Sequence, residues 1–278
     1  MKLRAISARP SSATWSWPDA RAAWRRVRNV APPVATLTAL IVIWEAACRI
    51  FPIPPYVLPP PSAVFSSGAN VPAMLWLGHV AATLEVVIIG FAASILVAVP
   101  LAMLLSASKL LSRSIFPVLV IVQSTPIVAI APIIVVTLGT GILARIVIAF
   151  AIGFMPLVIS TATGLQATPL ELIELSRSLR ARRIREYLQI RLPFAVPYIF
   201  SGLKVTMTLC VIGAVVSEFV AADKGLGYFI LMSTSYFKVA QAFSALAVLV
   251  ATSLLLFQLI CALQRGLFPW SLPKYPPA

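Results

Sequence analysis

The sequence has 278 residues, of which 60% are apolar and 11% are charged, whereas soluble domains carry about 25% charged residues. With a mean hydropathy of +0.98, this excludes a soluble enzyme and a nucleic-acid-binding protein, although the formal net charge is +14. The composition is that of an all-α integral membrane protein with several spans, in which basic residues mainly set the orientation.

The residue inventory excludes most catalytic chemistry. There is one histidine, His79, and the three cysteines lie far apart in apolar stretches, so no metal-ligand spacing is present in the sequence. The sequence also has no phosphate-binding motif of the form G-x-x-x-x-G-K-[ST]. We therefore expect no catalytic residue, metal or cofactor in this chain, and any energy source must lie elsewhere.

The chain begins with a basic tail, residues 1–33, that carries seven Lys and Arg. We expect it in the cytoplasm, either solvated or lying on anionic lipid. Six apolar stretches follow, each near the ~20 residues that a helix needs to cross a bilayer. Residues 34–278 are thus predicted to form one domain of six transmembrane helices, over 34–50, 80–105, 116–138, 142–163, 194–221 and 240–263.

The segments between these spans predict the orientation. Residues 51–79 contain seven prolines and no Lys or Arg, which favours an extended external segment. Basic residues gather instead in the N-terminal tail, in the links after the second and fourth spans, and at the C-terminus. Because cytoplasmic segments are enriched in Lys and Arg, both termini are predicted to be cytoplasmic.

The link between the fourth and fifth spans, residues 165–193, is patterned as an amphipathic helix. Thr168, Pro169 and Glu171 are expected to start it, with the threonine as cap and the acid near the positive end of the helix dipole. Something must cover the apolar face of such a helix. The residues alone do not decide between lipid head groups and a groove on another protein. The apolar residues of the face recur at spacings near three and four: Leu172, Ile173, Leu175, Leu179 and Ile184.

Three motifs resemble a known family. Residues 174–193 read E-L-S-x3-R-x9-I-x-L-P, which resembles the E-A-A-x3-G-x9-I-x-L-P loop signature of permease subunits of ABC importers. The stretch from Gly213 through Glu218 to Gly225-Leu-Gly-Tyr228 is similar to the end of the fifth span and outer loop of the branch that carries nitrate, sulfonates, taurine and pyrimidine or flavin precursors. The stretch from Gln123-Ser-Thr-Pro126 through Ala131-Pro132 resembles the third span of that branch.

The resemblance implies a type I importer permease in the bacterial inner membrane, paired as a homodimer. It implies an ATPase subunit, which binds ATP-Mg, on the cytoplasmic side and a substrate-binding protein on the outer side. It assigns the ATPase-coupling helix to Glu171, Glu174, Ser176, Arg180, Arg182, Ile190, Leu192 and Pro193. It assigns the solute path or outer gate to Gln123, Ser124, Thr125, Pro126, Glu218, Gly225, Gly227 and Tyr228.

Two positions leave alternatives open. Arg180 stands where the family has glycine, and a left-handed backbone there would cost arginine about 1 kcal/mol. Either the loop stays helical through Arg180, or the partner ATPase supplies an acidic contact. Glu218 either lines a gate or docking surface, or is a carboxylate at the water interface with a helix-end role.

A second class of function is a stand-alone ion-coupled transporter or channel. That class would show inverted repeats and charges near the bilayer midplane, and the sequence has no convincing internal repeat. An intramembrane enzyme is disfavoured by the single histidine and by the absence of paired central carboxylates.

Overall fold

The computed structural model describes residues 20–51 and 53–272. Most of the predicted basic tail over 1–33 therefore lies outside the described residues. The chain divides into two units, Met1–Ile53 and Pro54–Ala278. Every regular element within the described ranges is a helix, which agrees with the all-α prediction.

The first unit contains one helix, α1 (Ala20–Ile50). Its part from Ala31 onward is apolar and long enough to cross a bilayer. Near the C-terminal end, Arg49 Nε donates to Glu45 Oε1 at 2.7 Å. This pair has the i, i+4 spacing and places its cation in the last turn, where the helix dipole favours positive charge.

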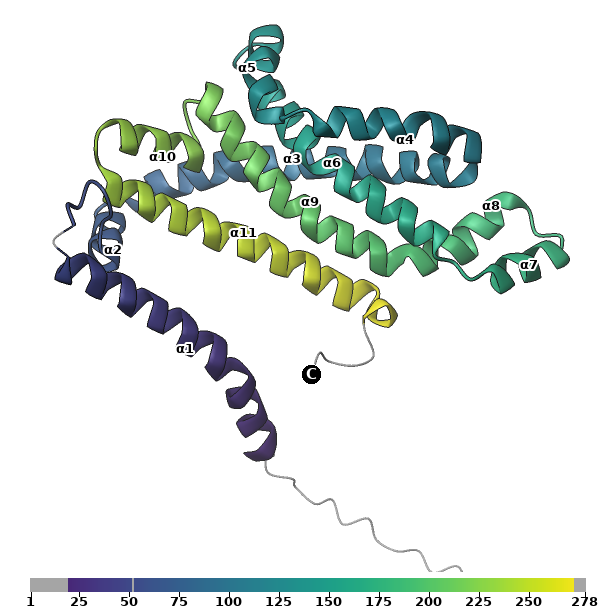
Figure 1. The fold of residues 1–278 in the computed structure, drawn as a ribbon, viewed down its shortest axis with the longest axis horizontal. Coiled ribbons are helices and arrows are strands. Elements are labelled where there is room, and N and C mark those ends of the chain that lie inside the picture. Colours follow the sequence, from purple (N-terminus) through teal and green to yellow (C-terminus); the bar gives the residue numbers. More distant parts are fainter. Residues whose placement is uncertain (1–19, 52, 273–278) are drawn as a thin grey trace, which may run out of the picture. The chain divides into compact units, whose positions relative to one another are not determined.

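The second unit is a bundle of helices (Figure 1). A π-helical turn, Tyr187–Arg191, joins α8 to α9 without a break, and a 3-10 turn, Pro269–Ser271, follows α11. The α-helices are α2 (Pro61–Ala69), α3 (Ala73–Ala107), α4 (Lys109–Ser124), α5 (Ile127–Leu138), α6 (Ile142–Gln166), α7 (Leu170–Ser178), α8 (Arg183–Glu186), α9 (Leu192–Ala221), α10 (Leu226–Ser235) and α11 (Val239–Leu267).

Helices α3, α6 and α9 form the centre of this bundle, with the most extensive packing between α6 and α9. Small residues let these two helices approach closely, as is common in membrane bundles. A Cβ on Gly213 of α9 would lie 2.6 Å from the Cα of Ala149 in α6. The Thr206 hydroxyl donates to the Gly153 carbonyl at 3.0 Å. Figure 1 shows α10 at one end of α9 and α7 and α8 at the other.

The predicted third span, 116–138, is not one helix. Among the described residues five helices are long and apolar enough to cross a membrane, and the count reaches six only if the bent pair α4–α5 is one span. The two halves meet at an angle of 90°. Thr125 is extended there, with φ −79° and ψ 124°, because the residue before a proline is disfavoured in the helical region, and Pro126 has no N–H to continue the helix.

The proline-rich link is also more structured than predicted. Instead of an extended segment, it contains α2, which begins at Pro61. A proline at the first helical position is favourable because its missing N–H would have no partner in the helix. The hydroxyl of Ser244 in α11 donates to the Val64 carbonyl at 2.5 Å, which attaches α2 to the bundle.

Candidate functional site

The proposed coupling loop turns sharply at Arg180, between α7 and α8. Arg180 has φ +54°. Its N–H donates to the Arg177 carbonyl at 2.9 Å, and the Ala181 N–H donates to the Ser176 carbonyl at 3.0 Å. These two bonds form a Schellman motif, whose left-handed position is usually glycine. The alternative in which the loop stays helical through Arg180 is therefore wrong, and the arginine adopts the backbone that the family glycine favours.

The start of α7 differs from the predicted cap. Pro169 occupies the N-cap position and makes no side-chain cap. The Thr168 hydroxyl instead donates back to the Leu165 carbonyl at 3.2 Å, at the end of α6. The predicted threonine cap is thus wrong, whereas Glu171 does lie in the first turn, where the helix dipole stabilises an acid.

The apolar face of α7 is largely uncovered in this chain. Ile173 is buried, but Leu175 is 57% exposed and Leu179 is 74% exposed. Glu171 and Glu174 are exposed as well, whereas Ser176 is buried. An exposed face that combines leucines and carboxylates is suited to a protein groove lined by apolar and basic groups.

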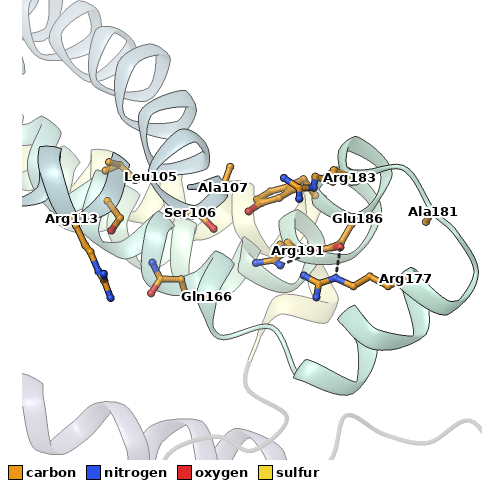
Figure 2. A pocket seen from close by; sticks show the side chains of 12 residues that line it. Leu105, Ser106, Ala107, Arg113, Gln166, Arg177, Ala181, Arg183, Glu186 and Arg191 are labelled. Carbon is orange, nitrogen blue, oxygen red and sulfur yellow. Dashed lines mark hydrogen bonds and ion pairs between the residues drawn. The ribbon is translucent and has the colours of Figure 1, made fainter. Parts of the chain in front are cut away.

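A buried ion pair fastens this loop to the start of α9. Glu186, which is buried, accepts from Arg191 Nη2 at 2.6 Å and from Arg191 Nε at 2.9 Å. Arg177 Nε of α7 lies 3.8 Å from the other oxygen of Glu186, as Figure 2 shows. The Arg191 guanidinium also lies 4.8 Å from the centroid of the Tyr187 ring. Glu186 was not among the residues predicted for the coupling loop, although an acid within a run of arginines was the available signal.

The remaining coupling residues lie where the loop becomes α9. Arg182 is exposed and precedes α8, where its carbonyl accepts from the Glu186 N–H at 3.2 Å. Ile190 is half-buried in the π-helical turn, and Leu192 and Pro193 are the first residues of α9. Because residues 183–221 are continuously helical, a displacement of the loop would be passed to the whole of α9.

At the opposite end of α9, Glu218 joins three helices in a buried polar cluster. Its side chain is 1% exposed. Oε1 accepts from the Thr83 hydroxyl of α3 at 2.8 Å, and Oε2 accepts from the Gly227 N–H of α10 at 2.6 Å. We call Glu218, Thr83, His79, Gly225 and Gly227 the Glu218 cluster.

The other contacts of the Glu218 cluster satisfy the first N–H groups of α10. The Leu226 N–H donates to Thr83 Oγ1 at 2.8 Å, and the Gly225 N–H donates to His79 Nδ1 at 3.1 Å. A helix N-terminus has unpaired N–H groups that attract a negative charge. The cap of α10 therefore comes from side chains of α3 and α9.

Both glycines of the Glu218 cluster are needed to bring the start of α10 close to the Glu218 carboxylate. Gly225 has φ +128°, a backbone that other residues rarely adopt, and a Cβ there would overlap the Glu218 carboxylate. A Cβ on Gly227 would lie 2.9 Å from Glu218 Oε2. Tyr228 is half-buried, and its ring stacks on His79 with centroids 6.2 Å apart.

The structure corrects part of the prediction for Glu218. The carboxylate is buried and does not lie at a water interface, although its helix-end role is as expected. His79 is buried as well. Thr83 was missed, although it follows His79 by four residues and so lies on the same face of a helix.

The third predicted group, Gln123 to Pro126, forms the bend between α4 and α5. All four residues are exposed. The hydroxyls of Ser124 and Thr125 donate to carbonyls of their own helix, those of Val120 at 2.8 Å and Ile121 at 3.3 Å. These bonds do not join the bend to the Glu218 cluster, so the predicted path residues form two separate groups.

Several known proteins are similar to this chain. The family described as "Binding-protein-dependent transport system inner membrane component" matches residues 90–270. Formylaminopyrimidine transport permease protein ThiX of Halalkalibacterium halodurans is 30% identical, over 88% of this chain and 98% of that protein. Riboflavin transport system permease protein RibX of Chloroflexus aurantiacus is 34% identical, over 84% of this chain and 88% of that protein.

Two further matches extend the comparison. Taurine transport system permease protein TauC of Escherichia coli is 26% identical, over 92% of this chain and 93% of that protein. A chain of the MetNI methionine ABC transporter, solved in inward-facing conformations, has the same fold with a TM-score of 0.60. It is 21% identical, and the match covers 73% of this chain and all of that one.

Proposed function

Given that the chain belongs to the family of binding-protein-dependent transport system inner membrane components, and is thus the permease subunit of an ABC importer, we propose how its parts work. Two copies form the path for a small solute in the bacterial inner membrane. An ATPase subunit binds one side of each copy, and a binding protein delivers the solute at the other. The family decides against a stand-alone ion-coupled transporter or channel and against an enzyme.

The coupling loop, residues 165–193, is the ATPase contact in this proposal. The observation that carries it is the exposed face of α7, where Leu175 and Leu179 lie beside Glu174 and no described residue covers them. The Arg191–Glu186 pair and the unbroken helix from residue 183 to residue 221 support transmission of ATPase movement to α9. ATP-Mg binds to the ATPase, and this chain contributes no nucleotide ligand.

The orientation follows from the charge distribution. The coupling loop carries six arginines between residues 177 and 191, and positive segments are retained on the cytoplasmic side. We therefore place the loop and both termini in the cytoplasm, and α10 with the Glu218 cluster at the outer side. In that position the Glu218 cluster holds α10 beneath the docking surface for the binding protein.

For the solute, we favour a nitrogen heterocycle of the kind that vitamin precursors contain. ThiX and RibX, named for formylaminopyrimidine and riboflavin transport, are 30% and 34% identical to this chain, whereas TauC is 26% identical. Because the binding protein makes most of the selection, its ligand is the direct test. A pyrimidine or flavin that raises its melting temperature, as binding to the native state requires, would support the proposal, whereas stabilisation by taurine or nitrate alone would contradict it.

The transport role itself is tested by reconstitution. The permease, its ATPase and the binding protein are placed in proteoliposomes, and uptake of the binding protein's ligand is measured with and without ATP. We expect uptake only when all three proteins and ATP are present. Uptake by the permease alone, driven by an ion gradient, would contradict it.

A further inference from the structure

A cavity of about 890 Å³ lies behind the coupling loop. Its walls come from the last turn of α3, the first turns of α4, the end of α6 and the loop from α7 to the π-helical turn. Figure 2 shows Ser106 and Gln166 on one side of it and Arg183, Glu186 and Arg191 on the other. Elements distant in sequence thus meet around one space.

The cavity is strongly basic. Among the described residues that line it, four are arginines and one is a glutamate, a net charge of three positive: Arg113, Arg177, Arg183, Arg191 and Glu186. Glu186 Oε1 is paired with Arg191 at 2.6 Å, and Glu186 Oε2 lies 3.8 Å from Arg177. Within the described part of the chain, no carboxylate lies within ion-pair distance of Arg113 or Arg183. The cavity therefore has guanidinium groups without a counter-charge.

A buried hydroxyl in the wall also lacks a partner. Ser106 Oγ is inaccessible to solvent and makes no hydrogen bond to any described residue. Buried polar atoms in native proteins are almost always paired, because an unpaired one is destabilising. Ser106 lines the same cavity, so a rotation of its side chain about χ1 would present Oγ to an acceptor bound there.

The position of the cavity indicates which kind of anion it would bind. It lies where the apolar spans α3 and α6 end and the basic loop begins, which is the level of lipid head groups. Guanidinium groups bind phosphate through paired N–H donors. A phosphate group also has more acceptor oxygens than a carboxylate, which suits several donors on opposite walls.

We propose that this cavity binds a phosphate group, supplied by an anionic phospholipid or by a free phosphate compound. A phosphate compound that fills the cavity, with Arg113 of α4 on one wall and Arg183 of α8 on the other, would fasten the coupling loop to the end of α3 and α4. This inference concerns a second ligand and does not depend on which solute the importer carries.

Two probes distinguish the sources. The full-chain permease is purified and titrated with inorganic phosphate by calorimetry. Separately, it is placed in phosphatidylcholine nanodiscs that contain phosphatidylglycerol, and the retained phosphatidylglycerol is counted by native mass spectrometry. Binding of phosphate alone indicates a free compound, retention of phosphatidylglycerol alone indicates a lipid, and binding of both indicates recognition of the phosphate group itself.

Variants test whether the cavity is the site. Arg113→Gln and Arg183→Gln should each weaken binding about tenfold, and Ser106→Ala, which removes no charge, about threefold. The matched control is Arg185→Gln, because Arg185 is an exposed arginine of α8 that does not line the cavity. Arg185→Gln should bind both probes as the wild type does. Every variant should elute from a sizing column at the same volume as the wild type.

Three results would overturn the proposal. One is failure of both probes to bind the wild-type permease. Another is an equal loss in Arg185→Gln, which would reveal only diffuse attraction to a basic surface. The third is loss of binding when the ATPase subunit is added, since acidic side chains of that subunit would then be the occupant of the cavity.

Discussion

The Glu218 carboxylate accepts a hydrogen bond from the Gly227 N–H at 2.6 Å, across the turn that joins α9 to α10. Its other oxygen accepts from Thr83 at 2.8 Å, so one buried acid joins α3, α9 and α10. A buried carboxylate is retained only when donors surround it, and here both oxygens have donors. The contact makes the position of α10 depend on this one side chain.

Replacement of Glu218 by glutamine tests that dependence. The amide has a single acceptor oxygen and an NH2 group, so either the Thr83 hydroxyl or the Gly227 N–H loses its partner. Loss of a hydrogen bond to a charged group costs about 1.5–3 kcal/mol. We expect Glu218→Gln to assemble with the ATPase as the wild type does but to take up solute more slowly, with faster hydrogen exchange at the start of α10.

The matched control is Glu85→Gln, because Glu85 is an exposed acid on α3 outside the Glu218 cluster. It should leave uptake and exchange unchanged. Normal uptake and normal exchange in Glu218→Gln would show that the carboxylate is not required to hold α10.

The orientation can be tested with single cysteines. The exposed positions Ser66 in α2, Ser235 at the end of α10 and Ser178 at the end of α7 are suitable, whereas Ser176 and Ser233 are buried. In a background without the native cysteines, Ser66→Cys and Ser235→Cys should react with an impermeant maleimide in intact cells. Ser178→Cys should react only after the membrane is opened, and labelling of it from outside would reverse the orientation.

Composition and periodicity were sufficient for the class of fold, because apolar helices of spanning length leave a strong local signal. They were insufficient where a single residue changes the backbone. Pro126 lies inside a stretch that is apolar on both sides, and Pro100 and Pro156 are accommodated inside continuous helices. Whether a proline kinks or ends a helix depends on the neighbours that satisfy the freed carbonyls.

The candidate site also has residues that could be predicted from the sequence and residues that could not. The positions Glu218, Gly225 and Gly227 could be selected from their resemblance to a family, but the partners Thr83 and His79 are more than 130 residues away in sequence, with separations of 135 and 146 residues. No local pattern indicates such a pairing. The Schellman motif at Arg180 was hidden because arginine is an unusual residue for a left-handed position, so only the family glycine indicated it.

The strain at Arg180 leads to a stability prediction. Arg180→Gly should relieve about 1 kcal/mol of backbone strain at φ +54° and slow proteolysis of the loop, because glycine adopts this conformation readily. Arg180→Ala is the control, since it removes the same charge and keeps the strain. Transport should survive in Arg180→Gly if the backbone of the loop alone determines its fit to the ATPase. Equal protease sensitivity of the glycine and alanine variants would contradict the strain argument.

The last prediction concerns what covers the α7 face. On lipid, the loop's arginines would contribute about 1 kcal/mol each, so Glu174→Lys would strengthen the contact by adding positive charge. In a protein groove, an exposed acid beside Leu175 and Leu179 pairs with a base at a fixed position, and reversal of its charge is repulsive. We therefore expect Glu174→Lys to reduce co-purification of the ATPase or to uncouple ATP hydrolysis from uptake, while membrane insertion is unchanged. Glu85→Lys, which reverses an exposed acid on α3 outside the loop, should leave ATPase association intact. Full transport with a normal amount of bound ATPase in Glu174→Lys would assign the α7 face to lipid.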